Sequence, residues 1–159
     1  MTRRGAQRPA AKRHPPNVAE RTGQGGAGPS HRGYEFDDAT GDIIGACIEV
    51  HRTLGPGFRE ITYQRALRME LEARGLDFSR EEKIPIHYKG KKIDTRRVDF
   101  IVEDCLLEIK AKREFDPEDY VQALSYLRGS GYEVGLLVNF GARRAEIKRL
   151  VNTAGMKGE

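Results

Sequence analysis

The stretch Arg97-Val98-Asp99-Phe100-Ile101-Val102-Glu103-Asp104-Cys105-Leu106-Leu107-Glu108-Ile109-Lys110 decides how this chain folds. Two largely apolar runs flank the polar pair Glu103-Asp104, a pattern typical of a β-hairpin closed by a two-residue turn. If that pair forms the turn, Val102 lies opposite Cys105, and counting outward places Asp99 opposite Glu108. We therefore expect two carboxylates to face each other across neighbouring strands.

The alternation of side chains along a strand sorts this hairpin into an apolar and a polar face. The apolar face is expected to carry Val98, Phe100, Val102, Cys105, Leu107 and Ile109. The polar face is expected to carry Asp99, Glu108 and Lys110 beside Ile101 and Leu106. Like charges directly across a ladder repel each other, so Asp99 and Glu108 call for a cation between them. Two carboxylates beside a lysine suit a magnesium-dependent site that cleaves phosphodiesters. The same three side chains also suit an ordinary polar strand face with a surface Glu–Lys pair.

Length and charge predict one domain over residues 34–159 behind a basic tail over residues 1–33. The tail holds seven Lys and Arg side chains against the single acid Glu20, whereas the remainder of the chain has a net charge of −2. The tail is rich in Gly, Pro and Ala and almost free of aliphatic residues, so we expect it to be disordered. Three interpretations of the tail stay open: nucleic-acid binding, a neutral appendage, and a start codon assigned too far upstream.

The apolar segments and the two cysteines indicate in which cellular compartment the protein is expected. No run approaches the roughly 20 apolar residues of a membrane helix. The N-terminus also lacks the apolar region of a signal peptide, so a cytoplasmic location is expected. Cys47 and Cys105 both lie in apolar stretches. We expect buried thiols at both positions rather than a disulfide or a zinc site.

Two helices are expected before the hairpin. The first begins near Thr40 or Asp42, either of which could cap it, and ends before Gly55-Pro56-Gly57 because proline and glycine interrupt helices. The second is expected over residues 58–74. Gly75 follows it at the position where a left-handed residue commonly closes a helix.

The remaining pattern completes an α/β sandwich with a mixed sheet in the order α-α-β-β-β-α-β-α. A strand is expected over residues 84–88, and Pro85 indicates an edge strand or a strand start. A helix opens at Asp116-Pro117, an N-cap followed by an N1 proline, and reaches residue 128. The apolar segment 132–140 predicts a strand that is covered on both faces. A last helix is expected over residues 143–151.

The segment Ile48–Tyr63 resembles the signature of the GxxExxY protein family, whose three named positions fall on Gly57, Glu60 and Tyr63. That family belongs to the PD-(D/E)xK nuclease superfamily, and the resemblance covers residues 36–152. It implies a restriction-endonuclease-like sandwich, a mixed β-sheet flanked by helices. Val98 stands where the superfamily often has proline before the aspartate.

The resemblance also implies a role for each polar residue of the hairpin. Asp99 and Glu108 would be metal ligands, with Glu60 and the main-chain carbonyl of Ile109 completing the set. Lys110 would orient the attacking water or stabilise charge on the phosphate. The implied cofactor is Mg²⁺ or Mn²⁺, and the implied activity is hydrolysis of DNA, with RNA as the alternative. Glu60 also suits a structural role, because an acid in a first helical turn is favoured by the helix dipole.

Gln122 and Tyr126 lie four residues apart on the helix after Lys110. This spacing resembles the extra motif of RecB-like nucleases, in which both residues line the site. The alternative is a plain helix flank. Tyr63 is expected to be a packed tyrosine and His51 a structural histidine.

A second class of function stays open: a non-catalytic module that binds nucleic acid or another partner on the same fold. Its contact surface would be the basic run Lys89-Gly90-Lys91-Lys92 with Arg96-Arg97, which also suits a solvated hairpin turn. The expected partner is nucleic acid, with DNA favoured, and no membrane. The resemblance leaves a homodimer open.

Overall fold

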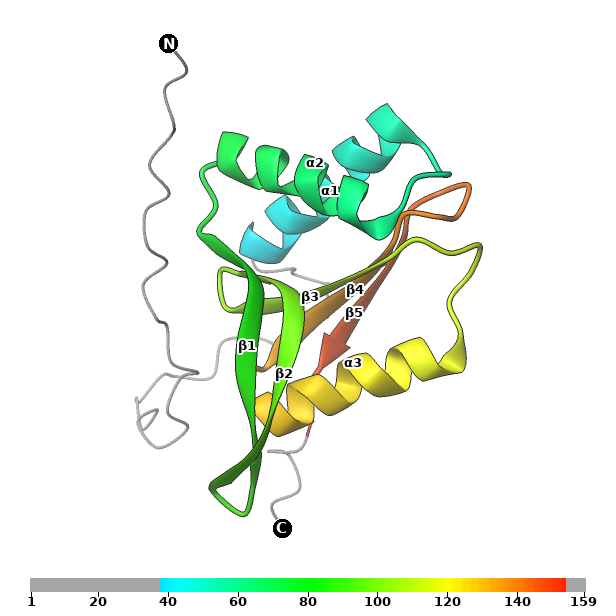
Figure 1. Ribbon diagram of the computed structural model, residues 1–159. Helices are drawn as coiled ribbons and strands as arrows, with labels where there is room; N and C mark the ends of the chain where they lie inside the picture. The colour runs from blue at the N-terminus through cyan, green and yellow to red at the C-terminus, as the bar shows by residue number, and fades with distance from the viewer. Residues whose placement is uncertain (1–37, 154–159) are drawn as a thin grey trace, which may run out of the picture.

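A five-stranded mixed sheet organises residues 38–153, the part of the chain that the computed structural model describes (Figure 1). Its strand order, β1-β2-β3-β4-β5, repeats the order along the chain. The elements are α1 (Asp38–Leu54), α2 (Glu60–Ala73), β1 (Phe78–Tyr88), β2 (Lys91–Val102), β3 (Cys105–Lys110), α3 (Pro117–Ser130), β4 (Val134–Asn139) and β5 (Glu146–Val151). The expected disordered tail over residues 1–33 lies outside the described residues.

Helices cover both faces of the sheet, as expected for an α/β sandwich (Figure 1). On one face α1 and α2 pack on the sheet through a cluster that includes Cys47, Leu67, Phe100 and Val138. On the other face α3 contributes Leu127 to a cluster that also includes Ile101, Leu106 and Tyr132. Only β3 and β4 are parallel among the paired strands of residues 38–153, and α3 connects them.

The two-residue turn predicted at Glu103-Asp104 is confirmed. Val102 pairs with Cys105 across it. Both turn residues adopt left-handed backbone angles, with φ of 47° and 68°, as the tight turn that matches the twist of a hairpin requires. Cys47 and Cys105 are buried thiols, as expected.

Val98 does not lie on the face predicted for it. It belongs to the cluster under α3, whereas Phe100 belongs to the cluster under α1 and α2. The pairing of β1 with β2 skips Asp99 and Glu81, and Glu81 has a φ of 49°. The register of β1 with β2 is the same on both sides of this point, so the face that Val98 takes has no explanation in the strand pairing.

The expected last helix over residues 143–151 is wrong, because this segment forms β5, antiparallel to β4. Ile147 and Leu150 lie three residues apart, a spacing that a helix would place on one face. In the structure Ile147 packs on the cluster under α1 and α2, and Leu150 packs on the cluster under α3. A strand places these two side chains on opposite faces, and both faces of this sheet are covered by apolar side chains.

Helix boundaries follow the predicted signals with one exception. Gly75 after α2 has a φ of 67°, and Asp116 forms a capping box with Asp119 at the start of α3. The first helix begins at Asp38, so Thr40 lies inside α1 and is buried instead of capping it. Within residues 38–153, no helix is long and apolar enough to cross a membrane. Pro85 lies on the edge strand β1, as predicted.

Candidate active site

Asp99 on β2 and Glu108 on β3 lie just beyond the point where the pairing of these two strands ends. The ladder between these strands runs from Val102–Cys105 to Phe100–Leu107 and goes no further. Beyond it, the Ile109 N–H donates to Asp99 Oδ2 at 2.7 Å, and the Asp99 N–H donates to Glu108 Oε1 at 3.3 Å. The two carboxylates are brought together as predicted, although side-chain hydrogen bonds replace the expected ladder pair.

Burial makes both acids hard to ionise. The Glu108 residue is only 8% exposed. Its burial, followed by the negative charge of Asp99, raises its pKa to about 8. Burial also raises the pKa of Asp99, against the opposing effects of the Ile109 N–H and the Lys110 charge. A bound cation would relieve this repulsion.

Gln64 on α2 fixes the orientation of Asp99. Its side chain is buried, and its Nε2 donates to Asp99 Oδ1 at 2.8 Å. On the other side of the amide, Arg80 Nη2 donates to Gln64 Oε1 at 3.4 Å. The sequence analysis missed Gln64. The available signal was its position four residues after Glu60, which places both on one side of α2.

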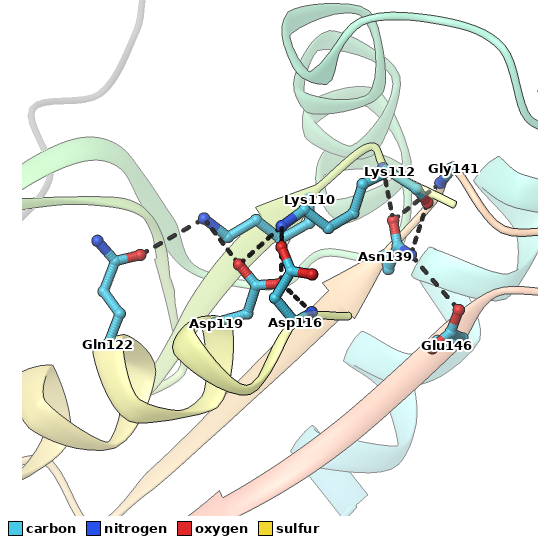
Figure 2. Close-up of polar contacts among 8 residues, drawn as sticks. All are labelled: Lys110, Lys112, Asp116, Asp119, Gln122, Asn139, Gly141 and Glu146. Atoms are coloured by element: carbon cyan, nitrogen blue, oxygen red, sulfur yellow. Dashed lines mark hydrogen bonds and ion pairs between the residues drawn. The ribbon is translucent and has the colours of Figure 1, made fainter. Parts of the chain in front are cut away.

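The Lys110 side chain extends toward α3 (Figure 2). Its Nζ donates to Gln122 Oε1 at 3.4 Å and lies 3.7 Å from Asp119 Oδ1. Gln122 therefore contacts Lys110. Tyr126 packs instead against the apolar cluster under α3.

Lys112 binds the first turn of α3 more tightly than Lys110 does (Figure 2). Its Nζ lies 2.7 Å from Asp116 Oδ2 and 2.9 Å from Asp119 Oδ2. Burial tends to raise the pKa of Asp119, but the hydrogen bonds from Lys112 and from the Asp116 N–H lower it overall. The sequence analysis assigned no role to Lys112 or Asp119.

One comparison with known proteins bears on this arrangement. A family model described as the PD-(D/E)XK nuclease superfamily matches residues 37–150. The chain belongs to the PD-(D/E)XK nuclease superfamily. No curated protein and no solved structure matches the chain. The resemblance to the GxxExxY family within that superfamily stays a prediction.

Membership in the PD-(D/E)XK nuclease superfamily supports a hydrolase of the nuclease kind, with nucleic acid as substrate. The mixed sheet with helices on both faces fits the restriction-endonuclease-like fold expected for this superfamily. The matched range begins one residue before α1 and ends within β5. It therefore includes every residue of the site.

Asn139 of this PD-(D/E)XK domain clamps the chain that follows Lys110 (Figure 2). Its fully buried side chain accepts hydrogen bonds from the N–H groups of Lys112 and Gly141, each at 3.0 Å, and donates to Lys112 O at 2.8 Å. A side chain at Gly141 would collide with the Lys112 backbone. The ends of β3 and β4 are thereby held together, which fixes the direction in which both lysines leave the sheet.

Glu60 reaches the same end of the sheet from the first turn of α2. The residue is exposed, yet burial of its carboxyl, followed by the charge of Asp99, raises its pKa. Lys110, Lys112 and a hydrogen bond with the Ala111 backbone act in the opposite direction. Tyr63 and His51 are structural: the Tyr63 hydroxyl donates to Gly55 O at 2.6 Å, and His51 Nε2 lies 2.9 Å from Ala142 O.

The oxygen donors at the site suit a hard divalent cation. Among residues 38–153, no three His, Cys, Asp or Glu side chains form a ready-made metal-binding group. Mg²⁺ is commonly held by only one or two carboxylates and retains several waters. Asp99 and Glu108 supply two such carboxylates, and burial raises the pKa of both. The residues present therefore fit a Mg²⁺ or Mn²⁺ site.

Proposed function

We propose that this protein is a metal-dependent nuclease that hydrolyses phosphodiester bonds in DNA, with RNA as the alternative substrate. The observation that carries the proposal is the pair of half-buried Asp99 and buried Glu108, where the pairing of β2 with β3 ends, with Lys110 two residues further along β3. Membership in the PD-(D/E)XK nuclease superfamily supports it.

Asp99, Glu108 and the Ile109 carbonyl would hold Mg²⁺ or Mn²⁺. In an antiparallel pair, the N–H and C=O of one residue point toward the same neighbour. Because the Ile109 N–H points at Asp99 Oδ2, we expect its carbonyl to point toward the same gap. The bound ion would make water a stronger nucleophile and neutralise charge developing on the phosphate. Binding would require both carboxyls to be ionised, so Glu108 would release its proton.

Lys110 would stabilise the charge that develops on the phosphate oxygens during attack. Its present partners hold it at 3.4 Å and 3.7 Å, long distances for charge-assisted contacts. Exchanging them for a phosphate oxygen therefore costs little. Glu60 would orient the attacking water or accept its proton, since burial raises the pKa of its carboxyl and so makes it a better proton acceptor. Gln122 would act as an auxiliary residue by guiding Lys110.

The decisive experiment compares cleavage by wild type and by Lys110→Ala on labelled duplex and single-stranded DNA with Mn²⁺. We expect the substitution to slow cleavage by roughly 10²–10³-fold, the usual loss when one group that stabilises transition-state charge is removed. Lys148→Ala removes an exposed lysine from β5 and is the matched control. An unchanged rate in Lys110→Ala would contradict the assignment.

Calorimetric titration of Mn²⁺ separates the metal centre from the catalytic lysine. Lys110→Ala should still bind Mn²⁺, and Asp99→Ala/Glu108→Ala should not. Nucleic-acid binding without metal-dependent cleavage in wild type, retained in the double variant, would favour the non-catalytic module.

A further inference from the structure

Residues 83–97 form a two-stranded projection that we call the hairpin arm. Between Tyr88–Lys91 at its tip and Lys83–Arg97 at its base, β2 pairs with β1 alone. The contacts of β2 with β3 begin only at Phe100. In Figure 1 the arm extends past α3, and its tip stands clear of the helices.

Positive charge is concentrated on the hairpin arm. The arm carries six of the 20 Lys and Arg side chains in residues 38–153 and only one of the 20 acids in that range. The basic residues are all exposed: Lys83, Lys89, Lys91, Lys92, Arg96 and Arg97. The acid, Asp94, pairs with Arg96 at 3.1 Å. The other five form no ion pair with another residue of the described range.

The distribution of this charge indicates a polyanion as the partner. The rest of residues 38–153 has five more acids than bases, so the arm is a local positive feature on an otherwise negative domain. Its two large exposed apolar side chains, Tyr88 and Ile93, lie among the lysines. Lys89 Nζ lies 5.4 Å from the centroid of the Tyr88 ring. Lysines that have no acidic partner gain most from phosphates, because binding also releases the counterions of the nucleic acid.

We infer that the hairpin arm binds the phosphate backbone of duplex DNA at a distance from the cleavage site. This inference rests on the proposed function, since it assigns the substrate class of the same site. A two-stranded β-ribbon is narrow enough to enter the major groove. Lysine and arginine contacts to phosphates position a duplex without reading its sequence.

The geometry of β2 sets the spacing between the arm contact and the cut. Lys92 and Asp99 lie on the same strand, seven residues apart. At about 3.3 Å per residue the separation is about 23 Å. A duplex lying along β2 rises about 3.4 Å per base pair, so the arm contacts phosphates about seven base pairs from the reacting bond. A duplex that extends less than about seven base pairs from the cut toward the hairpin arm cannot make the phosphate contacts of the arm.

The test compares Lys91→Glu/Lys92→Glu with Lys148→Glu/Arg149→Glu. Both variants reverse two adjacent exposed charges on a strand, one pair on the arm and one on β5. Affinity of the full chain for a labelled 30-base-pair duplex is measured in EDTA over a series of salt concentrations. We expect the arm variant to bind at least tenfold more weakly and the slope of log K against log salt to decrease by about 2. The β5 variant should change both values less.

Three outcomes would overturn the inference: unchanged duplex binding by the arm variant, equal losses in the two variants, or an equal loss for a 30-nucleotide single strand. Because EDTA removes metal, the measurement does not depend on cleavage. Absence of nuclease activity would contradict the proposed function and leave this test intact. Circular dichroism of both variants checks that the fold is retained.

Discussion

Two pairs of acids at one end of the sheet behave in opposite ways. Asp116 and Asp119 begin α3, and Lys112 lies within 3 Å of both. Asp99 and Glu108 lie between β2 and β3 and are held by main-chain N–H groups and an amide. The pKa of Asp119 is lowered, whereas the pKa of Glu108 is raised to about 8.

The difference separates acids whose charge is balanced by a lysine of the chain from acids whose charge is not. A lysine within the chain balances the pair at α3, and this ion pair joins the helix to the end of β3. The hairpin pair has donors of hydrogen bonds but no lysine at contact distance in the described range. Its missing charge must come from protons or from a metal. Three experiments can break or sharpen this contrast.

The largest expected effect is a loss of stability on raising pH without metal. The pKa of Glu108 is about 8 in the folded protein against 4.5 for an ordinary glutamate. A raised acid pKa gives stability that is full below about pH 4.5 and is lost as pH rises through about 8. Between pH 5 and 8.5, in EDTA, we expect a loss of up to about 4 kcal/mol and a Tm lower by roughly 15 °C.

Differential scanning calorimetry would measure this loss. Glu108→Gln, which cannot ionise, should flatten the decline, and Mn²⁺ should restore the stability of wild type at pH 8.5 but not that of the variant. The Asp119 contribution stays constant over this range, because a lowered acid pKa affects stability only at lower pH. A wild-type stability that does not change between pH 5 and 8.5 would contradict the contrast between the two pairs of acids.

The next effect concerns Asp116 and Asp119, the pair of acids that Lys112 contacts. Asp119→Asn removes the charge that binds Lys112 while retaining an acceptor for the Asp116 N–H. Loss of a charge-assisted hydrogen bond to a buried acid should cost about 1.5 kcal/mol of unfolding free energy. Urea denaturation measures it. Asp116→Asn is the matched control because its carboxyl is 63% exposed, and it should cost less than about 0.5 kcal/mol. Equal losses would show that burial does not distinguish the two acids.

The smallest effect tests how the hairpin pair is oriented. Gln64→Leu removes the amide that donates to Asp99 Oδ1. Partners of ligand residues typically contribute 10–100-fold to metal affinity, so we expect about tenfold weaker Mn²⁺ binding by calorimetry. Gln122→Leu makes the same chemical change beside Lys110 and should leave Mn²⁺ affinity unchanged. Equal affinities in Gln64→Leu and wild type would show that the strands alone position Asp99.

Local patterns predicted the hairpin and most helix boundaries, because their causes lie within a few residues. The turn at Glu103-Asp104, the closing Gly75 and the capping box at Asp116 each follow from short-range hydrogen bonds or backbone angles. Counting residues outward from the turn also predicted that Asp99 and Glu108 lie close together.

Features decided by distant partners could not be predicted. The segment 146–151 became a strand because β4 offered an open edge and both faces of the sheet were covered, neither of which its own spacing reveals. Gln64 joins Asp99 across 35 residues. Val98 packs with Ile84 of β1 and Leu127 of α3, neither of which its position in the hairpin reveals. The roles of Glu60, Lys110 and Ile109 came from the family resemblance and stay predictions.

The strand order has a consequence for folding kinetics. Because β1 to β5 lie side by side in chain order, each strand can join the growing sheet after closing only a short loop or one helix-containing connection. Such sheets keep contact order low and favour rapid assembly. Asp99, Glu108 and Lys110 lie within one hairpin and can meet early. The Gln64 amide arrives only when α2 docks, so the acids come together before the group that orients them.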